Sequence, residues 1–122
     1  MTTENKTNAK KHDWGYELIY ANTKTHGGKL LVFEKSAKTD FVFSDTIERT
    51  WFVNNGKFIF RWIDTNYGDV YQQEATDGSV FSVGTLTPYN IECISSNGSL
   101  SESNSGELDH KQYVVLKQEV LQ

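Results

Sequence analysis

Short runs of alternating apolar and polar residues, divided by turn sequences, constrain the fold of this chain more than any other feature. In one such run Phe58, Phe60 and Trp62 occupy every second position, which is the side-chain period of a β-strand. The three residues 54–56, just before this run, read Asn-Asn-Gly. Asn and Gly tolerate the positive φ angles of tight hairpins, so the sequence predicts a turn between two paired strands. No long stretch has a helical period, and we expect an all-β fold of antiparallel strands.

Strand-forming segments of this kind recur along the chain. We expect strands at residues 16–21, 29–34, 41–43, 50–53, 57–63, 69–74, 80–83 and 89–94. Residues 111–121 fit either a strand or a short helix. The serine-rich stretch 95–106 is expected to be a long loop. Residues 1–12 are polar and are expected to form a flexible N-terminal segment before a single domain, 13–122.

Composition excludes several classes of function. The chain has 122 residues, enough for one domain with one hydrophobic core. Its net charge of -4 argues against a nucleic-acid partner. No apolar run approaches the roughly 20 residues of a membrane helix, and the polar start of the chain predicts no secretory signal. Cys93 is the single cysteine, so an internal disulfide is excluded and a reducing, cytoplasmic location is expected.

Two segments with regularly placed glycines, 39–56 and 78–89, follow the spacing of a known pair of barrel motifs. The sequence Trp-Gly-Tyr-Glu stands at 14–17, and a Gly-Lys pair at 28–29 precedes an apolar run. On these features, which span residues 14–93, the chain resembles the small single-domain cupins. That resemblance implies an antiparallel jelly-roll β-barrel and is strongest to the branch related to mannose-6-phosphate isomerase. A lipid-binding up-and-down barrel is the alternative fold, because strand alternation alone does not select among barrels.

The residues that bind metal in cupins are replaced in this sequence. The family holds a divalent metal with two histidines and a glutamate of the first motif and a histidine of the second. Motif spacing places these positions at Val42, Ser44, Arg49 and Tyr89, with Glu48 in place of Arg49 if the shorter spacing applies. Valine cannot coordinate a metal, and arginine carries a permanent positive charge. The resemblance therefore implies a cupin without metal or cofactor.

The histidines and the cysteine offer no other obvious site. His12, His26 and His110 show no metal-ligand spacing and are expected to be exposed. Cys93 lies in a predicted strand and is expected to pack as a small apolar residue. No residue is therefore assigned a catalytic role.

The residues that replace the metal ligands at the motif positions predict a pocket of a different kind. Strand alternation adds Trp51 to the interior, together with either Phe58, Phe60 and Trp62 or the opposite face of that strand, which carries Arg61. A guanidinium among aromatic rings suits an anion or a sugar-like ligand. The alternative is that Arg49 pairs with Glu48 or Asp45 and the aromatic residues simply fill the barrel. The candidate ligand-binding residues are Ser44, Arg49, Trp51, Arg61 and Tyr89.

Three functions remain open on the sequence. We expect a metal-free small-molecule binding module rather than an enzyme. The first alternative is a metal-independent isomerase or epimerase acting on a sugar or nucleotide sugar, in which Tyr89 is the acid. No histidine stands at a motif position to act as its base. The second alternative is a structural protein whose sheets form a homodimer without a ligand. A homodimer is expected under all three.

Overall fold

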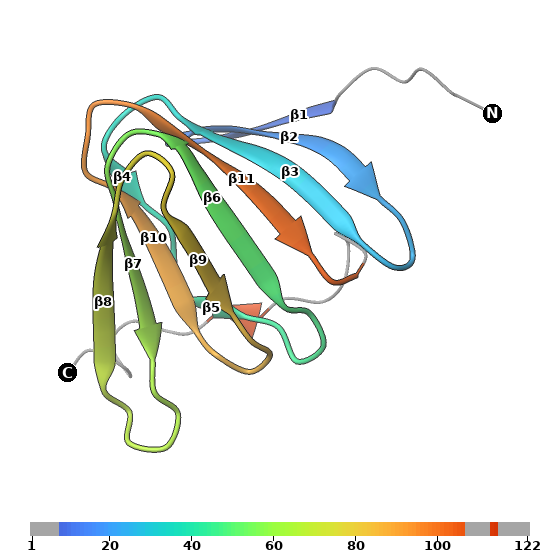
Figure 1. The fold of residues 1–122 in the computed structure, drawn as a ribbon, viewed down its shortest axis with the longest axis vertical. Helices are drawn as coiled ribbons and strands as arrows, with labels where there is room; N and C mark the ends of the chain where they lie inside the picture. The colour runs from blue at the N-terminus through green and yellow to red at the C-terminus, as the bar shows by residue number, and fades with distance from the viewer. Residues whose placement is uncertain (1–7, 107–112, 115–122) are drawn as a thin grey trace.

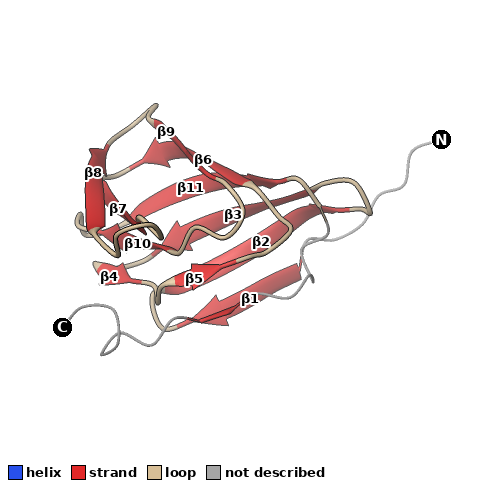
Figure 2. Cartoon of the chain, turned by 90° about the horizontal axis from the view of Figure 1, so that it is seen from below, coloured by secondary structure: helices blue, strands red, loops and turns tan. Residues whose placement is uncertain are grey.

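Two antiparallel β-sheets packed face to face make up the described part of the chain, residues 8–106 and 113–114, in this computed structural model. Figures 1 and 2 show the sheets and the order of their strands. The first sheet runs β1 (Asn8–His12), β2 (Gly15–Asn22), β3 (Gly27–Phe33), β11 (Gly98–Asn104), β6 (Arg49–Asn55) and β9 (Val80–Val83). The second runs β12 (Tyr113–Val114), β5 (Val42–Phe43), β10 (Tyr89–Cys93), β7 (Phe58–Ile63) and β8 (Val70–Ala75), with β4 (Ala37–Lys38) also paired to β10. No described segment is a helix of the length and apolarity that crossing a membrane requires.

Neighbouring strands in these sheets come from distant parts of the sequence. In the first sheet β11 lies between β3 and β6, and in the second β10 lies between β5 and β7. Such crossovers are typical of a jelly roll, whereas an up-and-down barrel pairs strands in sequence order. The expected all-β jelly-roll class is therefore confirmed.

The core between the sheets is largely aromatic. Phe33, Trp51, Phe58 and Phe60 are fully buried. The Trp51 ring lies 4.7 Å from that of Tyr89 and 5.5 Å from that of Phe60, centroid to centroid, so the core joins both sheets. Each buried aromatic side chain removes a large apolar area from water, and tilted ring pairs add to this stabilisation.

The predicted hairpin at 54–56 is present between β6 and β7. Gly56 has a φ of 101°, a value that residues with a side chain rarely adopt. Its backbone N–H donates a hydrogen bond of 2.9 Å to the carboxylate of Asp77. The turn therefore fixes the register of the two strands that enter and leave the core.

Two predictions about regular structure are wrong. Residues 8–12, expected to be flexible, form β1, which pairs antiparallel with β2 from Asn8↔Ile19 to His12↔Gly15. The serine-rich stretch 95–106, expected to be a loop, contains β11, whose backbone pairs with strands on both sides. Backbone pairing stabilises both segments although they contain few apolar residues. Of residues 111–121, only 113–114 lie within the described part, and they form β12.

Candidate functional site

A cavity of about 540 Å³ opens between the two sheets. One side of its wall comes from the β1–β2 hairpin, β3 and β11, and the other from the segment around β4 and β5 and from β10. Apolar side chains such as Leu31 and Ile91 line it together with the charged groups of Glu17, Lys29 and Glu102. A concave wall that combines apolar area with a few convergent polar groups is typical of a small-molecule site.

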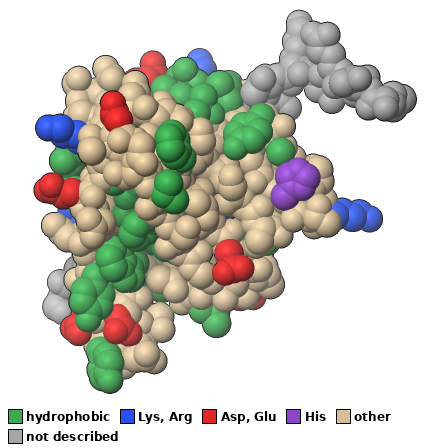
Figure 3. All heavy atoms as spheres, in the orientation of Figure 1, with side chains coloured by type: hydrophobic (Ala, Val, Ile, Leu, Met, Phe, Trp, Pro, Cys, Tyr) green, Lys and Arg blue, Asp and Glu red, His purple; other side chains and the backbone are tan. Residues whose placement is uncertain are grey.

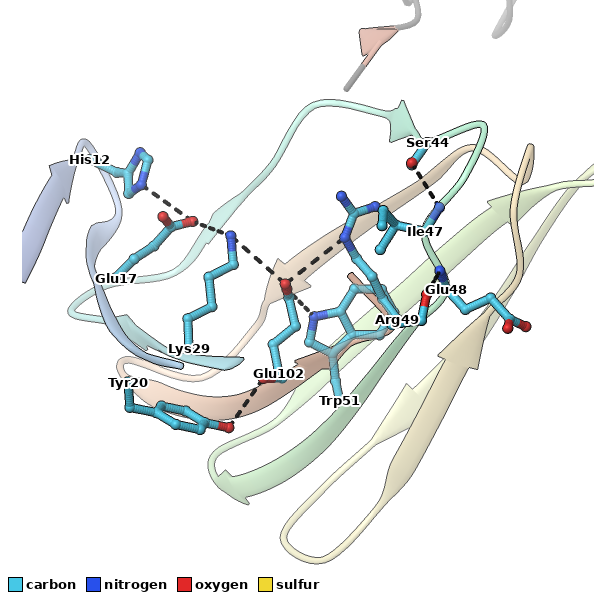
Figure 4. Close-up of polar contacts among 11 residues, drawn as sticks. His12, Glu17, Tyr20, Lys29, Ser44, Ile47, Glu48, Arg49, Trp51 and Glu102 are labelled. Carbon is cyan, nitrogen blue, oxygen red and sulfur yellow. Dashed lines mark hydrogen bonds and ion pairs between the residues drawn. The ribbon is translucent and has the colours of Figure 1, made fainter. Parts of the chain in front are cut away.

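Glu17, Lys29 and Glu102 line this cavity and belong to a row of ionic side chains that continues beyond the lining to Arg49, as Figure 4 shows. Lys29 Nζ lies 3.1 Å from Glu17 Oε1 and 3.8 Å from Glu102 Oε2. On the other side of Glu102, Arg49 Nε lies 3.9 Å from the same Oε2 atom. Charges of opposite sign therefore alternate along the row, which begins on β2 and ends on β6.

Glu102 is the most deeply buried carboxylate of the row. Its side chain is 3% exposed, and its Oε1 accepts a hydrogen bond of 2.7 Å from Trp51 Nε1. The other oxygen, Oε2, is buried, and among the described residues no donor lies within hydrogen-bond distance of it. Lys29 and Arg49 provide charge at 3.8 and 3.9 Å but are too far away for a hydrogen bond. A carboxylate accepts several hydrogen bonds when ionised, so Glu102 retains unused acceptor capacity at the cavity wall.

Tyr89 lies opposite this row, on β10. The Arg49 guanidinium carbon is 5.6 Å from the centre of the Tyr89 ring. Burial of the phenol raises its pKa well above the usual value, and the negative charge of Glu102 raises it further. The positive charge of Arg49 and a hydrogen bond from it act in the opposite direction but do not cancel these effects. Tyr89 is therefore a neutral phenol that keeps its proton at physiological pH.

His12 and Trp14 form the rim of the cavity on the β1–β2 side. Their ring centroids lie 4.5 Å apart with an angle of 7° between the planes, and the Trp14 ring also stacks on Phe33 at 4.3 Å. His12 Nε2 lies 3.6 Å from Glu17 Oε1. His12 was expected to be exposed, but it is half-buried and lines the cavity, because β1 holds it beside β2.

The structure brings together three of the five residues predicted to bind a ligand. Arg49, Trp51 and Tyr89 meet in the interior, and Arg49 rather than Glu48 is the buried neighbour. Of these three residues, Tyr89 lines the cavity, whereas Arg49 and Trp51 lie behind its lining residues. Ser44 is 2% exposed, but its Oγ accepts hydrogen bonds from the backbone N–H groups of residues 46 and 47 and so orders the loop before β6.

Arg61 does not line the interior. Because Phe58 and Phe60 point into the core, alternation turns Arg61 to the outer face of its sheet. There Arg61 Nη2 donates to Glu92 Oε1 at 2.7 Å and Nε donates to Gln72 Oε1 at 3.3 Å. The sequence left open which face of β7 is internal, and the structure shows that it is the aromatic face.

Three of the four positions identified from the cupin motifs converge in space. Val42 pairs directly with Tyr89 across β5 and β10, and Arg49 lies over the Tyr89 ring. The backbone N–H of Leu86 donates to the Ser44 carbonyl, which ties the loop before β10 to the end of β5. Within residues 8–106 and 113–114, no three His, Cys, Asp or Glu side chains are grouped so that they could hold a metal ion.

Solved structures with the same arrangement are numerous. The capsular polysaccharide assembling protein CapF from Staphylococcus aureus superposes with a TM-score of 0.82 at 13% identity, over 92% of this chain and 33% of that one. Oxalate decarboxylase OxdC from Bacillus subtilis gives a TM-score of 0.78 at 9% identity, over 94% of this chain and 33% of that one. This chain has the cupin fold. Peruvianin-I, a cysteine peptidase from Thevetia peruviana latex, is less similar, with a TM-score of 0.67 and 14% identity over 75% of this chain and 56% of that one.

These similarities show the fold alone. At such low identity the activities of CapF and OxdC do not transfer to this cupin-fold domain, which spans about a third of the length of either chain. No protein-family model matches the sequence, and no curated protein matches it either.

The ionic row around Glu102 was not predicted from the sequence. Glu17 and Lys29 lie within the stretches that carry the cupin resemblance, but neither was assigned a role. Glu102 was placed in a loop, although residues 98–104 place Gly98, Leu100, Glu102 and Asn104 at alternate positions, all of them buried. An acidic residue in phase with Leu100 in a strand-like pattern was the available signal for an inward-facing carboxylate.

Proposed function

We propose that this chain is a small-molecule binding module in which the cupin cavity holds a polar ligand, sugar-like or anionic, without a metal ion. The observation that carries the proposal is the buried Glu102 carboxylate at the cavity wall, whose Oε2 has no hydrogen-bond donor among the described residues. Buried polar atoms in folded proteins nearly always have a partner. A ligand with hydroxyl or amino groups supplies that donor.

The size and the chemistry of the cavity support a small ligand. A volume of about 540 Å³ falls within the range of ordinary ligand pockets. By motif spacing, Val42 and Tyr89 correspond to metal-ligand positions of cupins, and the resemblance to the mannose-6-phosphate isomerase branch makes a sugar-like molecule a natural candidate. In the proposed site Tyr89 donates its phenolic proton and Glu102 accepts, so the two wall groups bind complementary atoms of the ligand.

Native mass spectrometry on untagged protein, purified without added metal or chelator, tests this proposal. We expect an additional mass of a few hundred daltons on the parent protein. Glu102→Gln is expected to reduce its occupancy, whereas Glu92→Gln, which alters the Arg61–Glu92 pair on the outer face, is expected to leave occupancy unchanged. Equal loss in both variants, or a stoichiometric transition metal as the additional mass, would contradict the proposed site.

A second candidate function is acid–base catalysis as an isomerase or epimerase. The specific observation is that His12 and Tyr89 line the same cavity, with His12 Nε2 3.6 Å from Glu17 Oε1. An imidazole can accept a proton from a ligand as a general base, and a neutral phenol can donate one as a general acid. Catalysis requires that Tyr89→Phe and His12→Gln each abolish turnover of a bound sugar while binding persists. Turnover that survives both substitutions would exclude this function.

A further inference from the structure

We infer that the ligand of the cavity is an uncharged polyhydroxyl molecule, a neutral sugar or polyol, rather than an anion. This inference rests on the proposed binding function and narrows its ligand class. It follows from the charge balance of the ionic row, from the way those charges are already paired, and from the unused acceptor at its centre.

Within the described residues, the ionic row is balanced before any ligand enters. It contains two carboxylates, Glu17 and Glu102, and two cations, Lys29 and Arg49, in alternating order. The inner pair is deeply buried, since the side chains of Arg49 and Glu102 are 4% and 3% exposed. Interactions between charges are strong in such surroundings. A ligand with a net charge would disturb a row that is already neutral.

Neither cation of the row is positioned to receive an anion. Lys29 lies between two carboxylates, at 3.1 Å from Glu17 and 3.8 Å from Glu102. Arg49 contacts Glu102 and the Tyr89 ring. An anion that approached either cation would also approach a carboxylate of the row, and the resulting repulsion would offset its attraction.

Among the described residues, the Asp and Lys side chains of the outer part of the cavity do not add a surplus of positive charge. Asp13 and Asp40 contribute carboxylates to the wall, and Lys38 contributes one ammonium group. All three are exposed, so solvent weakens their effect. Such a rim offers no attraction to a phosphate or a carboxylate.

A hydroxyl group fits the centre of the row. Lys29 Nζ and Glu102 Oε2 are 3.8 Å apart, so one oxygen placed beside them can contact both at about 2.8 Å. A hydroxyl then accepts from the ammonium group and donates to the carboxylate, and it brings no charge. Glu17 Oε1 and the Tyr89 phenol offer an acceptor and a donor on the same wall. Adjacent hydroxyls on one carbon skeleton match this arrangement.

Matched sugars that differ only in charge provide the test. Calorimetric titrations would compare glucose, galactose and mannose with the 6-phosphate, the uronate and the 2-amino derivative of each. The neutral member of at least one set is expected to bind about tenfold more tightly than its charged derivatives. Tighter binding of a phosphate or uronate would overturn this inference and leave the proposed binding function intact.

The retained ligand from native mass spectrometry provides a second readout that does not depend on the choice of sugars. If a molecule copurifies, its identification as a neutral polyol or sugar supports the inference, and identification as an anion or a cation contradicts it. If no sugar of any charge binds and no mass is retained, the proposed function itself fails, which is a different outcome from the wrong ligand charge.

Substitutions that remove a negative or a positive charge from the row are expected to shift the ligand preference in opposite directions. Glu102→Gln removes one negative charge and is expected to shift preference toward the phosphate and the uronate. Lys29→Met removes one positive charge and is expected to shift preference toward the amino sugar. Glu92→Gln on the outer face is the matched control and is expected to leave preference unchanged. Thermal unfolding would establish that each variant is folded. Equal weakening of all sugars by both row variants would show a merely structural role and refute the inference.

Discussion

At the scale of single residues, burial decides which of the two arginine–glutamate pairs matters for stability. Arg49 and Glu102 are almost completely enclosed, whereas the side chains of Arg61 and Glu92 are 22% and 30% exposed. Removing one member of a buried pair leaves an uncompensated charge in the interior. An exposed pair is screened by water and contributes little.

Arg49→Met is therefore expected to destabilise the protein strongly. We predict a loss of about 3 kcal/mol in the free energy of unfolding, near the lower end for a broken buried pair, because Lys29 still faces Glu102. Arg61→Met is the control and is expected to cost about 1 kcal/mol or less. Urea denaturation of both variants measures the difference. Equal effects would mean that Arg49 does not compensate the Glu102 charge.

Tyr89 gives the protein a specific sensitivity to alkaline pH. Its pKa is raised in the folded state, chiefly by burial, whereas the unfolded chain ionises at an ordinary pKa of about 10. The unfolded state thus loses its proton first, so the stabilisation is fully present below about pH 10 and is lost as the pH rises toward the folded pKa. We predict that the free energy of unfolding falls by up to about 1.4 kcal/mol per pH unit above pH 10. In Tyr89→Phe this fall is expected to be shallower, and an identical slope in chemical denaturation would contradict it.

Residues of the site could be predicted only where the spacing of a known motif located them in the sequence. Counting from two glycines located Arg49 and Tyr89, and the structure places them in contact. Glu102 belongs to no such motif. Its place in the site depends on contacts with Trp51 and Lys29, which lie far from it in sequence. The spacing rule left Glu48 and Arg49 equivalent, and only the direction of β6 distinguishes them.

At the scale of elements, β11 shows why a central strand escaped detection. Leu100 is its one large apolar residue, and serines fill its outward positions. Its stability comes from backbone pairing with β3 and β6 on both sides. Local sequence does not reveal such long-range pairing, since strand propensity depends on context. The hairpin of β6 and β7 was predictable, because its turn and its alternation are both local.

Leu100→Ala tests the place of β11 in the core. Leu100 has 0% exposure, and removing a buried leucine side chain of this kind is expected to cost about 2–5 kcal/mol. Ser103→Ala, on the exposed side of the same strand, is expected to change the free energy of unfolding by less than about 0.5 kcal/mol. Thermal or urea unfolding provides the measurement. A small effect of Leu100→Ala would indicate that this segment is a surface loop rather than a core strand.

Gly56→Val tests the hairpin between β6 and β7. A side chain at Gly56 would adopt an unfavourable φ of 101° and would place its Cβ 2.8 Å from the Cα of Gly98. We predict a destabilisation of at least about 1–3 kcal/mol from the backbone conformation alone. Gly84→Val is the matched control, because a Cβ there meets nothing within 4 Å. Melting temperatures that fall equally in both variants would refute this account of the turn.

At the scale of the whole molecule, the fold does not determine the function. CapF and OxdC share the cupin fold with this domain at 13% and 9% identity. Folds of this kind hold unrelated chemistries, and the chemistry depends on the side chains in the barrel. The jelly roll was predictable from the resemblance of the glycine spacings to those of cupins, whereas strand alternation alone predicted only an antiparallel β-barrel or sandwich. The balanced ionic row was not, because it requires β2, β3, β6 and β11 to be placed side by side.

One side of the molecule has the features of a contact surface. In the described part of the chain, β8 forms one end of its sheet and β9 forms one end of the other. Tyr67, Val70 and Tyr71 are exposed at β8 and its hairpin, where Figure 3 shows hydrophobic side chains gathered at the lower left. β8 contains neither lysine nor proline, the residues that commonly protect an edge strand. Two copies of β8 can pair antiparallel about a two-fold axis.

We therefore predict a homodimer formed through β8, with a mass of twice the chain in analytical ultracentrifugation. Tyr71→Lys is expected to weaken the dimer at least about tenfold, because it places a charge beside the paired strands. Phe52→Lys is the control, since Phe52 and Tyr71 are 45% and 46% exposed and Phe52 lies on the other sheet. A monomeric parent protein would contradict the prediction. A dimer that Phe52→Lys disrupts and Tyr71→Lys leaves intact would place the interface on the opposite sheet.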